Sequence, residues 1–522
     1  MYWKMEEPTK KEKMLIKRLG KGSAFFAFLC AIKKDLFTEE FQREMIETYS
    51  RNRESNVPPA MLAMVWLLQA YTQASDREAI EATIFDLRWQ LVLGTLQEEE
   101  PPFGQGTLSR FRTRLIENDL DQRIVDRTIE LARETGLFGW KNLKGALDSS
   151  PLRGAGRVED TWNLIGRSIA NLVNALVKVT DFEKVALIDK LDLQILTGKS
   201  FKSALDIDWD DTVAKEEALQ RLINDAFRLR DWVLKTPTID HENPLIKTAI
   251  DDLNRVIEQD TEPDPTTSGR KLLKGTAPDR MPSLGDKEMR HGRKSKANKF
   301  TGYKRHFGLI EDCNLVAGAI ALPANIPEQK ATKPLLSALS RHGDVVILDI
   351  DRGYLGSKEI PILHEKGVLI RCKSWPTPNQ NRFSKQDFQI DLKQNQVTCP
   401  SGNTVQILSQ KHGKRAHFSF KLCSSCSLQS QCTKSKHGRR IQIHEQEQFL
   451  QILRERQNTP EGRASLRERV SVEHSLARLQ QRQGSRARYK GTRKNTMDLR
   501  RYAVLNNLFE IKRYEEKQKQ AA

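Results

Sequence analysis

The stretch that decides the fold is Val345-Val346-Ile347-Leu348-Asp349-Ile350-Asp351-Arg352-Gly353-Tyr354. Its apolar beginning predicts a central strand that is buried on both faces. Asp351 follows that strand and opens a turn, and open α/β sheets bind their ligands at the carboxyl ends of their strands. Asp349 lies on the same strand face because side chains alternate, so it is the alternative candidate for a role at this site. The turn sequence favours Asp351.

A second candidate carboxylate belongs to Asp148. The segment Gly145-Ala146-Leu147 predicts another apolar strand, and we expect that strand to end at Asp148. In the alternative interpretation, Asp148 accepts hydrogen bonds in a turn with Ser149 and Ser150. The sequence leaves this alternative open.

A third candidate, Glu473, lies far downstream in a basic segment with helical periodicity. We expect it to share an inward-facing stripe with Leu466, Val470 and Ala477. An acid in such a place needs a partner, because charged side chains are rarely buried alone. The partner is either a metal ion or Arg469, which lies four residues earlier on the same helix.

Composition points to a nucleic acid as the partner. The 522 residues include 86 basic and 68 acidic side chains, so the formal net charge is +18 and the pI is about 9.5. A field of one sign favours polyanions. Hard divalent cations prefer carboxylate oxygens, so three separated acids on such a chain indicate a metal site that works on nucleic acid.

Hydropathy argues against a membrane protein. No apolar run approaches the roughly 20 residues that cross a bilayer. The run from Ala24 to Ile32 follows basic residues like the core of a signal peptide, but Lys33-Lys34-Asp35 replaces the small-residue cleavage site. We therefore expect this run to be a buried segment of a cytoplasmic, nucleoid-associated protein.

Four of the seven cysteines lie close together late in the chain, at Cys399, Cys423, Cys426 and Cys432. Four thiolates at this spacing predict a closed, structural zinc site. Two disulfides are the alternative, which the reducing cytosol disfavours. His417 or His437 could also replace one of the cysteines as a ligand.

Periodicity predicts the order of elements around these residues. Residues 40–135 have helical patterns, and residues 162–234 have them again. Proline-rich and polar sequence then predicts a linker, whose order is doubtful between about residues 260 and 285. Two strands follow within residues 303–320, and two strand-and-helix repeats follow within residues 332–372. This order predicts a mixed sheet flanked by helices.

The same order resembles the ribonuclease H-like catalytic domain of bacterial insertion-sequence transposases of the Asp-Asp-Glu type. The matching motifs are Leu147-Asp148-Ser149-Ser150, Ile350-Asp351-Arg352-Gly353-Tyr354 and Arg469-Val470-Ser471-Val472-Glu473. Met289-Arg290-His291-Gly292-Arg293-Lys294, Gly302-Tyr303-Lys304 and the helical run from Ser75 to Leu91 add to the likeness. The late cysteine cluster is similar to that of one subgroup.

The resemblance implies an α/β fold: a ribonuclease H-like mixed sheet with a helical insertion, a zinc-bearing insertion and an all-α N-terminal domain. We expect residues 1–140 to form a helical domain for DNA binding or dimerisation. The catalytic domain would span residues 141–510, interrupted by a helical insertion and linker at 155–285 and by the cysteine-cluster insertion at 374–460. Residues 511–522 would form a tail.

The implied activity is metal-dependent DNA cleavage and strand transfer at the ends of a mobile element. Asp148, Asp351 and Glu473 would be the catalytic residues and would hold two Mg²⁺ (or Mn²⁺) ions, which suit phosphodiester chemistry. The partners would be the terminal inverted repeats and a target, both double-stranded DNA, with the protein acting as a homodimer or higher oligomer. The alternatives are a nuclease of the same fold that does not join DNA, and an inactive zinc-containing DNA-binding protein.

Two basic tracts, residues 287–305 and 478–494, flank the expected catalytic strand and helix. Such tracts can bind the phosphate backbone, although a charge run can also be no more than a solvated face. The residues that we expect to contact DNA are Arg290, Arg293, Lys294, Lys304, Arg469, Arg482, Arg486, Arg488 and Lys490.

Overall fold

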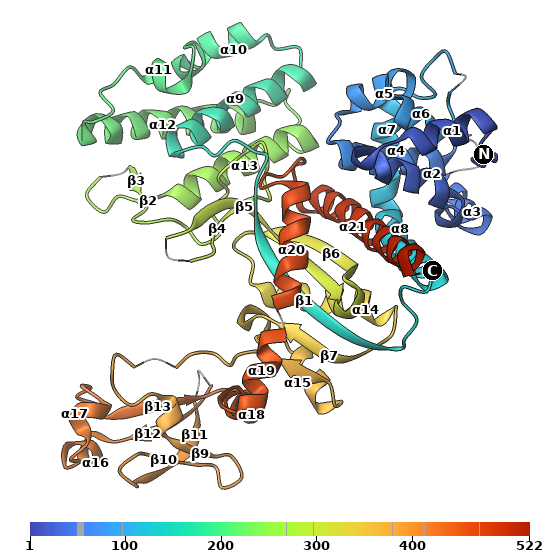
Figure 1. Cartoon of the computed structure of the whole chain (residues 1–522). Helices are drawn as coiled ribbons and strands as arrows, with labels where there is room; N and C mark the ends of the chain where they lie inside the picture. The colour runs from blue at the N-terminus through green and yellow to red at the C-terminus, as the bar shows by residue number, and fades with distance from the viewer. Residues whose placement is uncertain are drawn as a thin grey trace.

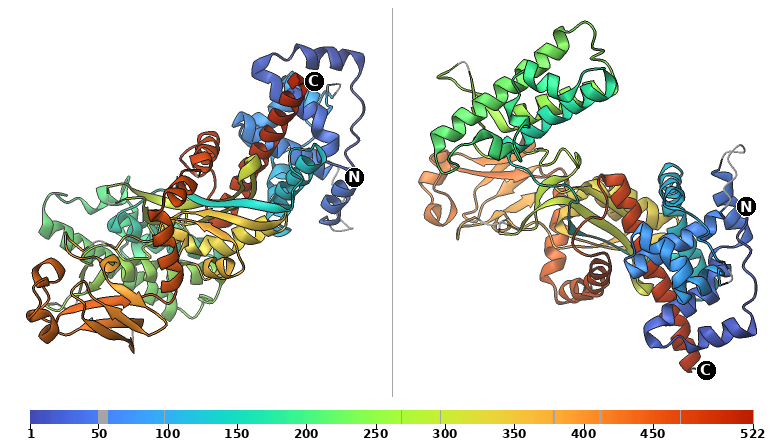
Figure 2. Two further views of the ribbon diagram at one scale, coloured as in Figure 1. Left: turned by 60° about the horizontal axis from the view of Figure 1, so that its bottom comes forward. Right: turned by 90° about the horizontal axis from the view of Figure 1, so that it is seen from above.

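The structure is a computed structural model that describes residues 1–49, 57–96, 98–267, 269–295, 297–377, 379–410, 413–468 and 470–521. The side chains of Lys21 and of residues 470–473 lie outside this description. The described residues bury two large apolar cores, one shared by the N-terminal helices, the central sheet and the last helix and one in the helical insertion, and a small core in the cysteine region. Figure 2 shows the N-terminal helices and the helical insertion on opposite sides of the sheet.

The central sheet is mixed, as predicted. Its strands are β1 (Asn142–Arg153), β4 (Arg290–Arg293), β5 (Lys299–Ile310), β6 (Leu315–Pro323), β7 (Asp344–Ile350) and β8 (Leu369–Arg371). From one edge the order is β5, β1, β7 and β8, while β4 and β6 both pair with the outer edge of β5. The strands β1, β7 and β8 are parallel, and β5 runs antiparallel to β1. The sheet thus carries two adjacent parallel strands at its centre, β1 and β7.

Helices cover both faces of this sheet (Figure 1). The helices α14 (Thr332–Ser340) and α15 (Glu359–Glu365) connect β6 to β7 and β7 to β8. Leu339 of α14 packs so closely on β1 that a Cβ atom at Gly145 would lie 3.2 Å from its Cδ1. On the other face, α20 (Val470–Gln483) crosses β1. Ser150 belongs to that second face, because it accepts a hydrogen bond from Arg305, which also donates to Gln483 at the end of α20.

The last helix, α21 (Thr492–Ala521), protects the outer edge of β6. The Asn507 side chain accepts from the Val316 N–H at 2.7 Å and donates to the Val316 carbonyl at 3.0 Å. Thr496 Oγ1 accepts from the Ala321 N–H at 3.0 Å. An open strand edge is a template for aggregation, and here side chains of α21 occupy it. The helix continues through Ala521, beyond the point where we expected a tail to begin.

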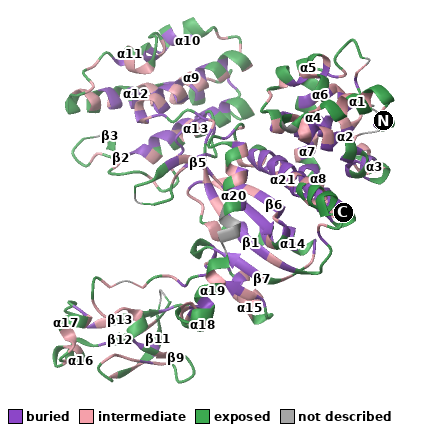
Figure 3. Cartoon of the chain, in the orientation of Figure 1, coloured by how far each residue is buried: buried purple, intermediate pink, exposed green. Residues whose placement is uncertain are grey.

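Eight helices precede the sheet: α1 (Lys10–Arg18), α2 (Ala24–Leu36), α3 (Glu39–Glu47), α4 (Pro59–Thr72), α5 (Asp76–Phe85), α6 (Leu87–Leu93), α7 (Gln105–Glu117) and α8 (Leu120–Glu134). The run from Ala24 to Ile32 is the buried helix α2, as expected. The predicted capping box of Ser75 and Glu78 begins α5. Nearly every residue of α4 is buried, which explains its uniformly apolar sequence. Figure 3 shows the buried residues concentrated in these helices, α21 and the sheet.

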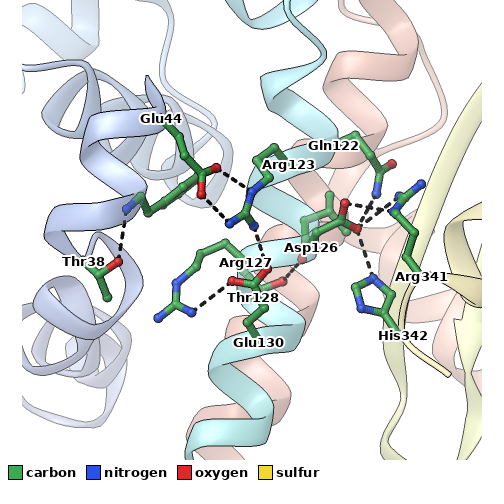
Figure 4. Close-up of polar contacts among 12 residues, drawn as sticks. Thr38, Glu44, Gln122, Arg123, Asp126, Arg127, Thr128, Glu130, Arg341 and His342 are labelled. Carbon is green, nitrogen blue, oxygen red and sulfur yellow. Dashed lines mark hydrogen bonds and ion pairs between the residues drawn. The ribbon is translucent and has the colours of Figure 1, made fainter. Parts of the chain in front are cut away.

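Polar contacts fix α8 between the N-terminal helices and the sheet (Figure 4). On one side, Arg123 donates two hydrogen bonds to Glu44 of α3, at 2.7 and 3.0 Å. On the other side, Asp126 pairs with Arg341 and with His342 at 3.1 and 3.0 Å, just before β7. Gln122 donates to the Ala317 carbonyl of β6 at 2.9 Å. The helix therefore holds the N-terminal helices on the sheet.

The insertion after β1 contains α9 (Thr161–Val179), α10 (Lys184–Lys190), α11 (Phe201–Leu205), α12 (Thr212–Lys235), α13 (Pro244–Asp260), β2 (Thr261–Pro263) and β3 (Arg270–Leu272). The last part of the segment that we expected to be a linker is packed instead. Arg280 donates two hydrogen bonds of 2.7 Å to Asp260, Met281 is buried in the insertion core, and Asp286 accepts from the Tyr303 hydroxyl at 2.5 Å. Its proline-rich composition concealed these long-range contacts.

The cysteine region is an antiparallel sheet with its own small core. Its strands are β9 (Gln389–Asp391), β10 (Gln396–Thr398), β11 (Thr404–Gln410), β12 (Gly413–Phe418) and β13 (Arg439–Ile443). The short helices α16 (Phe420–Ser424) and α17 (Gln429–Cys432) carry Cys423 and Cys432, and Cys426 lies between them. The helices α18 (Glu447–Asn458) and α19 (Pro460–Glu468) lead back to α20.

Candidate catalytic site and nucleic-acid contacts

Asp148 and Asp351 lie side by side at the centre of the sheet. In the parallel pair of β1 and β7, Leu147 is opposite Ile350, so the two aspartates occupy the next positions along their strands. Asp148 is 8% exposed, and Asp351 is exposed at the end of β7. The predicted strand and turn thus bring two of the three candidate carboxylates together.

The strand β1 does not end at Asp148, as we had expected, but continues to Arg153. Residues 148–153 stay in the sheet because they pair with β5 on one side. On the other side, the pairing with β7 stops at Leu147. Pro151 is tolerated in this part of the strand because its nitrogen lies on the edge that β7 no longer pairs, so no ladder hydrogen bond is lost there.

The backbone and side chain of Ser149 organise the surroundings of Asp148. The Ser149 N–H donates to Asp148 Oδ1 at 2.6 Å, and the Ser149 hydroxyl donates to Glu328 Oε1 at 2.8 Å. Glu328 comes from a 3-10 turn (Glu328–Ala331) that follows β6. This third acid also lies against the second aspartate's turn, because a Cβ atom at Gly353 would be 1.9 Å from Glu328 Oε2.

A buried Tyr-His pair lies beneath these acids. The Tyr354 hydroxyl is 2.9 Å from Nδ1 of His306. Burial raises the pKa of Tyr354 well above its usual value, and the negative charges of Glu328, Asp148 and Asp351 raise it further. Burial, with a smaller effect of Lys304, lowers the pKa of His306 to about 3, so its ring is neutral at ordinary pH. The three carboxylates therefore act on one buried hydroxyl.

Sequence patterns gave no reason to choose Glu328. It lies in a polar stretch between β6 and α14, and nothing in its spacing distinguishes it from a solvated acid. Glu328 comes close to Ser149 because β5 pairs with β1 on one side and with β6, which precedes Glu328, on the other. The nearest signal is Pro327, which together with Glu328 begins a turn.

Asp349, the alternative to Asp351, is completely buried and belongs to a different group of charges. Arg371 of β8 donates to Asp349 Oδ2 from Nε at 2.7 Å and to Glu311 Oε2 at 2.9 Å, and it also pairs with Glu468 of α19. Burial, followed by the neighbouring Asp349, raises the pKa of Glu311 to about 8. Asp349 has a fixed counter-charge inside the protein, whereas Asp351 is exposed at the end of β7.

Glu473 lies in α20, but its side chain is outside the described residues, and so is all of Arg469. The helix itself is on the sheet face of Ser150, which is also the face of Asp148 because the two residues are two apart on β1. The expected stripe is not continuous. Leu466 belongs to α19 and Ala477 is exposed, whereas Leu476, Leu479 and Gln483 are the inward residues of α20.

The four late cysteines line one small pocket, together with Phe418 and Arg439. Burial raises the pKa of Cys432, and the other three thiols add to this effect, while Arg439 opposes it. None of the seven cysteines forms a disulfide. Across the described residues, however, no three His, Cys, Asp or Glu side chains are arranged to hold a metal ion.

The residues expected to contact DNA have different surroundings. Arg290 is buried and pairs with Asp279 at 2.7 Å, and Arg482 lies over the ring of Phe509, with 3.9 Å between its Cζ and the ring centroid. Neither guanidinium is presented to a ligand. Lys304 is half-buried, and its Nζ is 4.0 Å from Glu328 Oε1. The exposed members of the set are Arg293, Lys294, Arg486, Arg488 and Lys490.

Two known protein families match the chain. A transposase domain (DUF772) matches residues 21–114, which cover α2 to α7, and a transposase DDE domain matches residues 398–511, which include α20 and Glu473. Both matches support an insertion-sequence transposase of the Asp-Asp-Glu type. Such transposases act on DNA and use divalent metal ions. No curated protein and no solved structure matches this transposase. None of its helices in the described part of the chain is long and apolar enough to cross a membrane.

Proposed function

We propose that this transposase binds the ends of its mobile element, cleaves the DNA and joins a 3′ end to a target. The observation that carries the proposal is the position of Asp148 and Asp351, each directly after the paired residues Leu147 and Ile350 of two parallel strands, with the helix of Glu473 on the face of Asp148. The strand order, with β6 and β5 antiparallel next to the parallel β1, β7 and β8, supports a ribonuclease H-like interpretation of the sheet.

Asp148, Asp351 and Glu473 are the proposed metal ligands, because their oxygens suit hard divalent cations. Two bound magnesium ions would activate the attacking oxygen and stabilise the leaving oxygen of the phosphodiester. Within the protein, the Ser149 N–H orients the Asp148 carboxylate, and Glu328 adds negative charge nearby. A strongly negative site of this kind attracts cations and needs them before it can accept a phosphate.

The proposed DNA contacts are the exposed residues Arg293, Lys294, Arg486, Arg488 and Lys490. Most of them lie near the end of β1 or in the segment between α20 and α21. Transposition joins two element ends, so we also propose that the protein acts as a dimer or higher oligomer on DNA.

The test is Glu473→Gln, which keeps the shape of the side chain but removes the charge that a hard cation requires. We expect cleavage and joining of a labelled element end to fall by at least about 1000-fold while binding of the same DNA persists. Glu461→Gln, an exposed change in α19, is the matched control and should have no effect. Full cleavage activity of the Glu473 variant would contradict the three-carboxylate assignment.

The same assay separates the alternatives. A nuclease that does not join would release cut DNA without strand-transfer products, and an inactive DNA-binding protein would give neither product. Joined products that depend on Glu473 are expected only of the transposase.

We further propose that Cys399, Cys423, Cys426 and Cys432 hold a structural zinc ion, since the four thiols share one pocket. Four protein ligands would leave no open position for a substrate, so the site would stabilise the cysteine region. Freshly reduced protein should contain about one zinc ion per chain, and Cys423→Ser should lose it, whereas Ser425→Ala should not. A metal analysis without zinc would exclude the site.

A further inference from the structure

An open groove lies at the far end of β1, where the chain leaves the sheet and enters the helical insertion. Its charged lining residues are Arg153, Arg157 and Arg486, and Thr301 and Ser485 are among the others. No acid lines the groove, and all three arginines are exposed. It is therefore a concave surface with three positive charges and no counter-charge in its wall.

The floor of the groove is built from backbone hydrogen bonds. The Arg153 N–H donates to the Ser485 carbonyl at 2.9 Å, and the Ala487 N–H donates back to the Arg153 carbonyl at 2.7 Å. On the other side, the Gly154 N–H donates to the Thr301 carbonyl at 2.9 Å. Three segments that are distant in the sequence are thereby fixed together, and the groove is formed before any ligand arrives.

The rim that carries Arg157 is also fixed. A Cβ atom at Gly156 would lie 2.6 Å from Cβ of Asp286 and 2.8 Å from Oγ of Ser283, so only glycine allows the backbone to pack this closely. Arg486 makes one long hydrogen bond of 3.4 Å to the Ala155 carbonyl. Among the described residues, neither Arg153 nor Arg157 forms an ion pair with an acid. The nearby Arg280 and Arg290 do pair with acids, so Arg153 and Arg157 are a local exception among the described residues.

Charge and distance indicate what the groove binds. Residues 161–260 of the insertion carry 18 acidic and 13 basic side chains, so the insertion beside the groove repels polyanions. Arg153 is five residues beyond Asp148 on β1, which is about 16 Å at roughly 3.3 Å per residue. A duplex that lies along β1 would reach the groove about five base pairs from the aspartates, because its rise is about 3.4 Å per pair.

We propose that Arg153, Arg157 and Arg486 form a phosphate-binding groove for the DNA backbone beside the cleaved strand. The inference rests on the proposed function, since it assumes that the aspartates face DNA. Guanidinium groups suit this role because they bind phosphate oxygens in a bidentate fashion. The groove contacts the backbone and reads no bases, so it positions the duplex independently of sequence.

The test compares the wild-type protein with the double variant Arg153→Ala and Arg157→Ala. Binding to a labelled 30-base-pair duplex is measured over a range of salt concentrations without divalent metal. Each lost phosphate contact should reduce the slope of log K against log salt by about 0.9, so the slope should fall by about 1.8 for any DNA sequence. The control is Lys184→Ala with Lys199→Ala, which removes the same charge from exposed positions of the insertion and should leave the slope unchanged.

The outcomes distinguish this proposal from the proposed function. If the wild type binds DNA and the double variant keeps the wild-type slope, the groove proposal is wrong and the proposed transposase function is unaffected. If the wild type shows no salt-dependent DNA binding, the proposed function itself fails. A reduced slope with an RNA duplex but not with DNA would also overturn the groove as a DNA site. Equal thermal unfolding of all variants confirms that they are folded.

Discussion

Two neighbouring regions at the end of β7 use their carboxylates differently. Asp351 belongs to the open end of the strand, and Asp349, two residues earlier, belongs to the buried charge cluster around Arg371. Asp351 is exposed and lies beside Asp148, and Glu328 contacts Ser149 and packs against Gly353, next to both aspartates in the chain. Asp349 is fully buried, and Arg371 balances its charge. A buried acid needs a fixed counter-charge, whereas an acid at the rim of a site can also reach a cation from solution. The difference separates a site that can exchange ligands from one that holds strands together.

The charge cluster has a structural role that explains why it lies near the site. Asp349 belongs to β7, Arg371 to β8, Glu311 to the turn after β5, and Glu468 to the helix that precedes α20. The Arg371 guanidinium thus joins β7, β8 and the turn after β5 to the end of α19. Because α20 carries Glu473, the cluster fixes the start of the segment that holds the proposed third metal ligand.

The largest effect is expected for Asp351→Asn. The change removes a metal-binding charge from an exposed position, so DNA cleavage should fall by about 1000-fold or more, equal to about 4 kcal/mol of barrier. The free energy of unfolding should change by less than about 0.5 kcal/mol, as for most surface substitutions. Magnesium-dependent cleavage and chemical denaturation of the same preparation measure the two quantities. A variant that cleaves at the wild-type rate would remove Asp351 from the site.

The second-largest effect is expected for Asp349→Asn, which should lower stability rather than cleavage. It leaves Arg371 buried with less counter-charge, so the free energy of unfolding should fall by about 3 kcal/mol. Cleavage per folded molecule should change much less than in Asp351→Asn. Denaturation with and without Arg371→Met provides the control, because removing both charges should restore part of the lost stability. Loss of activity without loss of stability would instead make Asp349 a metal ligand.

The contrast between the two aspartates could be predicted only in part. Alternation placed Asp349 and Asp351 on one face, and the apolar run placed them at the end of a central strand, because both properties are local. The partner of Asp349 is Arg371, which comes from the next parallel strand after a helix, and no local pattern assigns one arginine to one aspartate. The same limit explains why Arg290 seemed available for DNA, since its partner Asp279 lies in a segment that resembled a linker.

Strand and helix limits show a second restriction. Polar residues and Pro151 suggested that β1 ends at Asp148, but pairing with β5 continues the strand. The helical stripe was expected to bury Ala477, but Ala477 is exposed, and Leu476 and Leu479 are buried instead. In both cases tertiary contacts override the local pattern. The position of Glu328 is of the same kind, because it depends on three strands at once.

The pH dependence of stability would sharpen the comparison further. The folded pKa of Glu311 is raised to about 8, from the 4.5 expected for the unfolded chain. The folded state therefore keeps a proton that the unfolded state releases, so this group's stabilisation is complete below pH 4.5 and is lost as the pH rises through about 8. In that window the wild type should lose up to about 1.4 kcal/mol per pH unit relative to Glu311→Gln. Unfolding curves of both proteins at several pH values test this, and parallel pH profiles would contradict a protonated Glu311.

The smallest effect is expected for Ser149→Ala, which changes the open site without touching its aspartates. The variant loses the hydrogen bond from the Ser149 hydroxyl to Glu328 but keeps the N–H that holds Asp148. A hydrogen bond to a charged, half-buried acceptor is worth about 1 kcal/mol or slightly more, so cleavage should fall less than about tenfold and stability by a similar free energy. Ser150→Ala is the matched control, since its hydroxyl contacts Arg305 and not Glu328.

If the Ser149 hydroxyl only packs Glu328 against Gly353, Ser149→Ala should lower stability but leave the magnesium concentration for half-maximal cleavage unchanged. If Glu328 contributes to the field that attracts the cation, that concentration should rise in Ser149→Ala and stay at the wild-type value in Ser150→Ala. The open site would then depend on the placement of its charges, whereas the buried cluster depends on their balance.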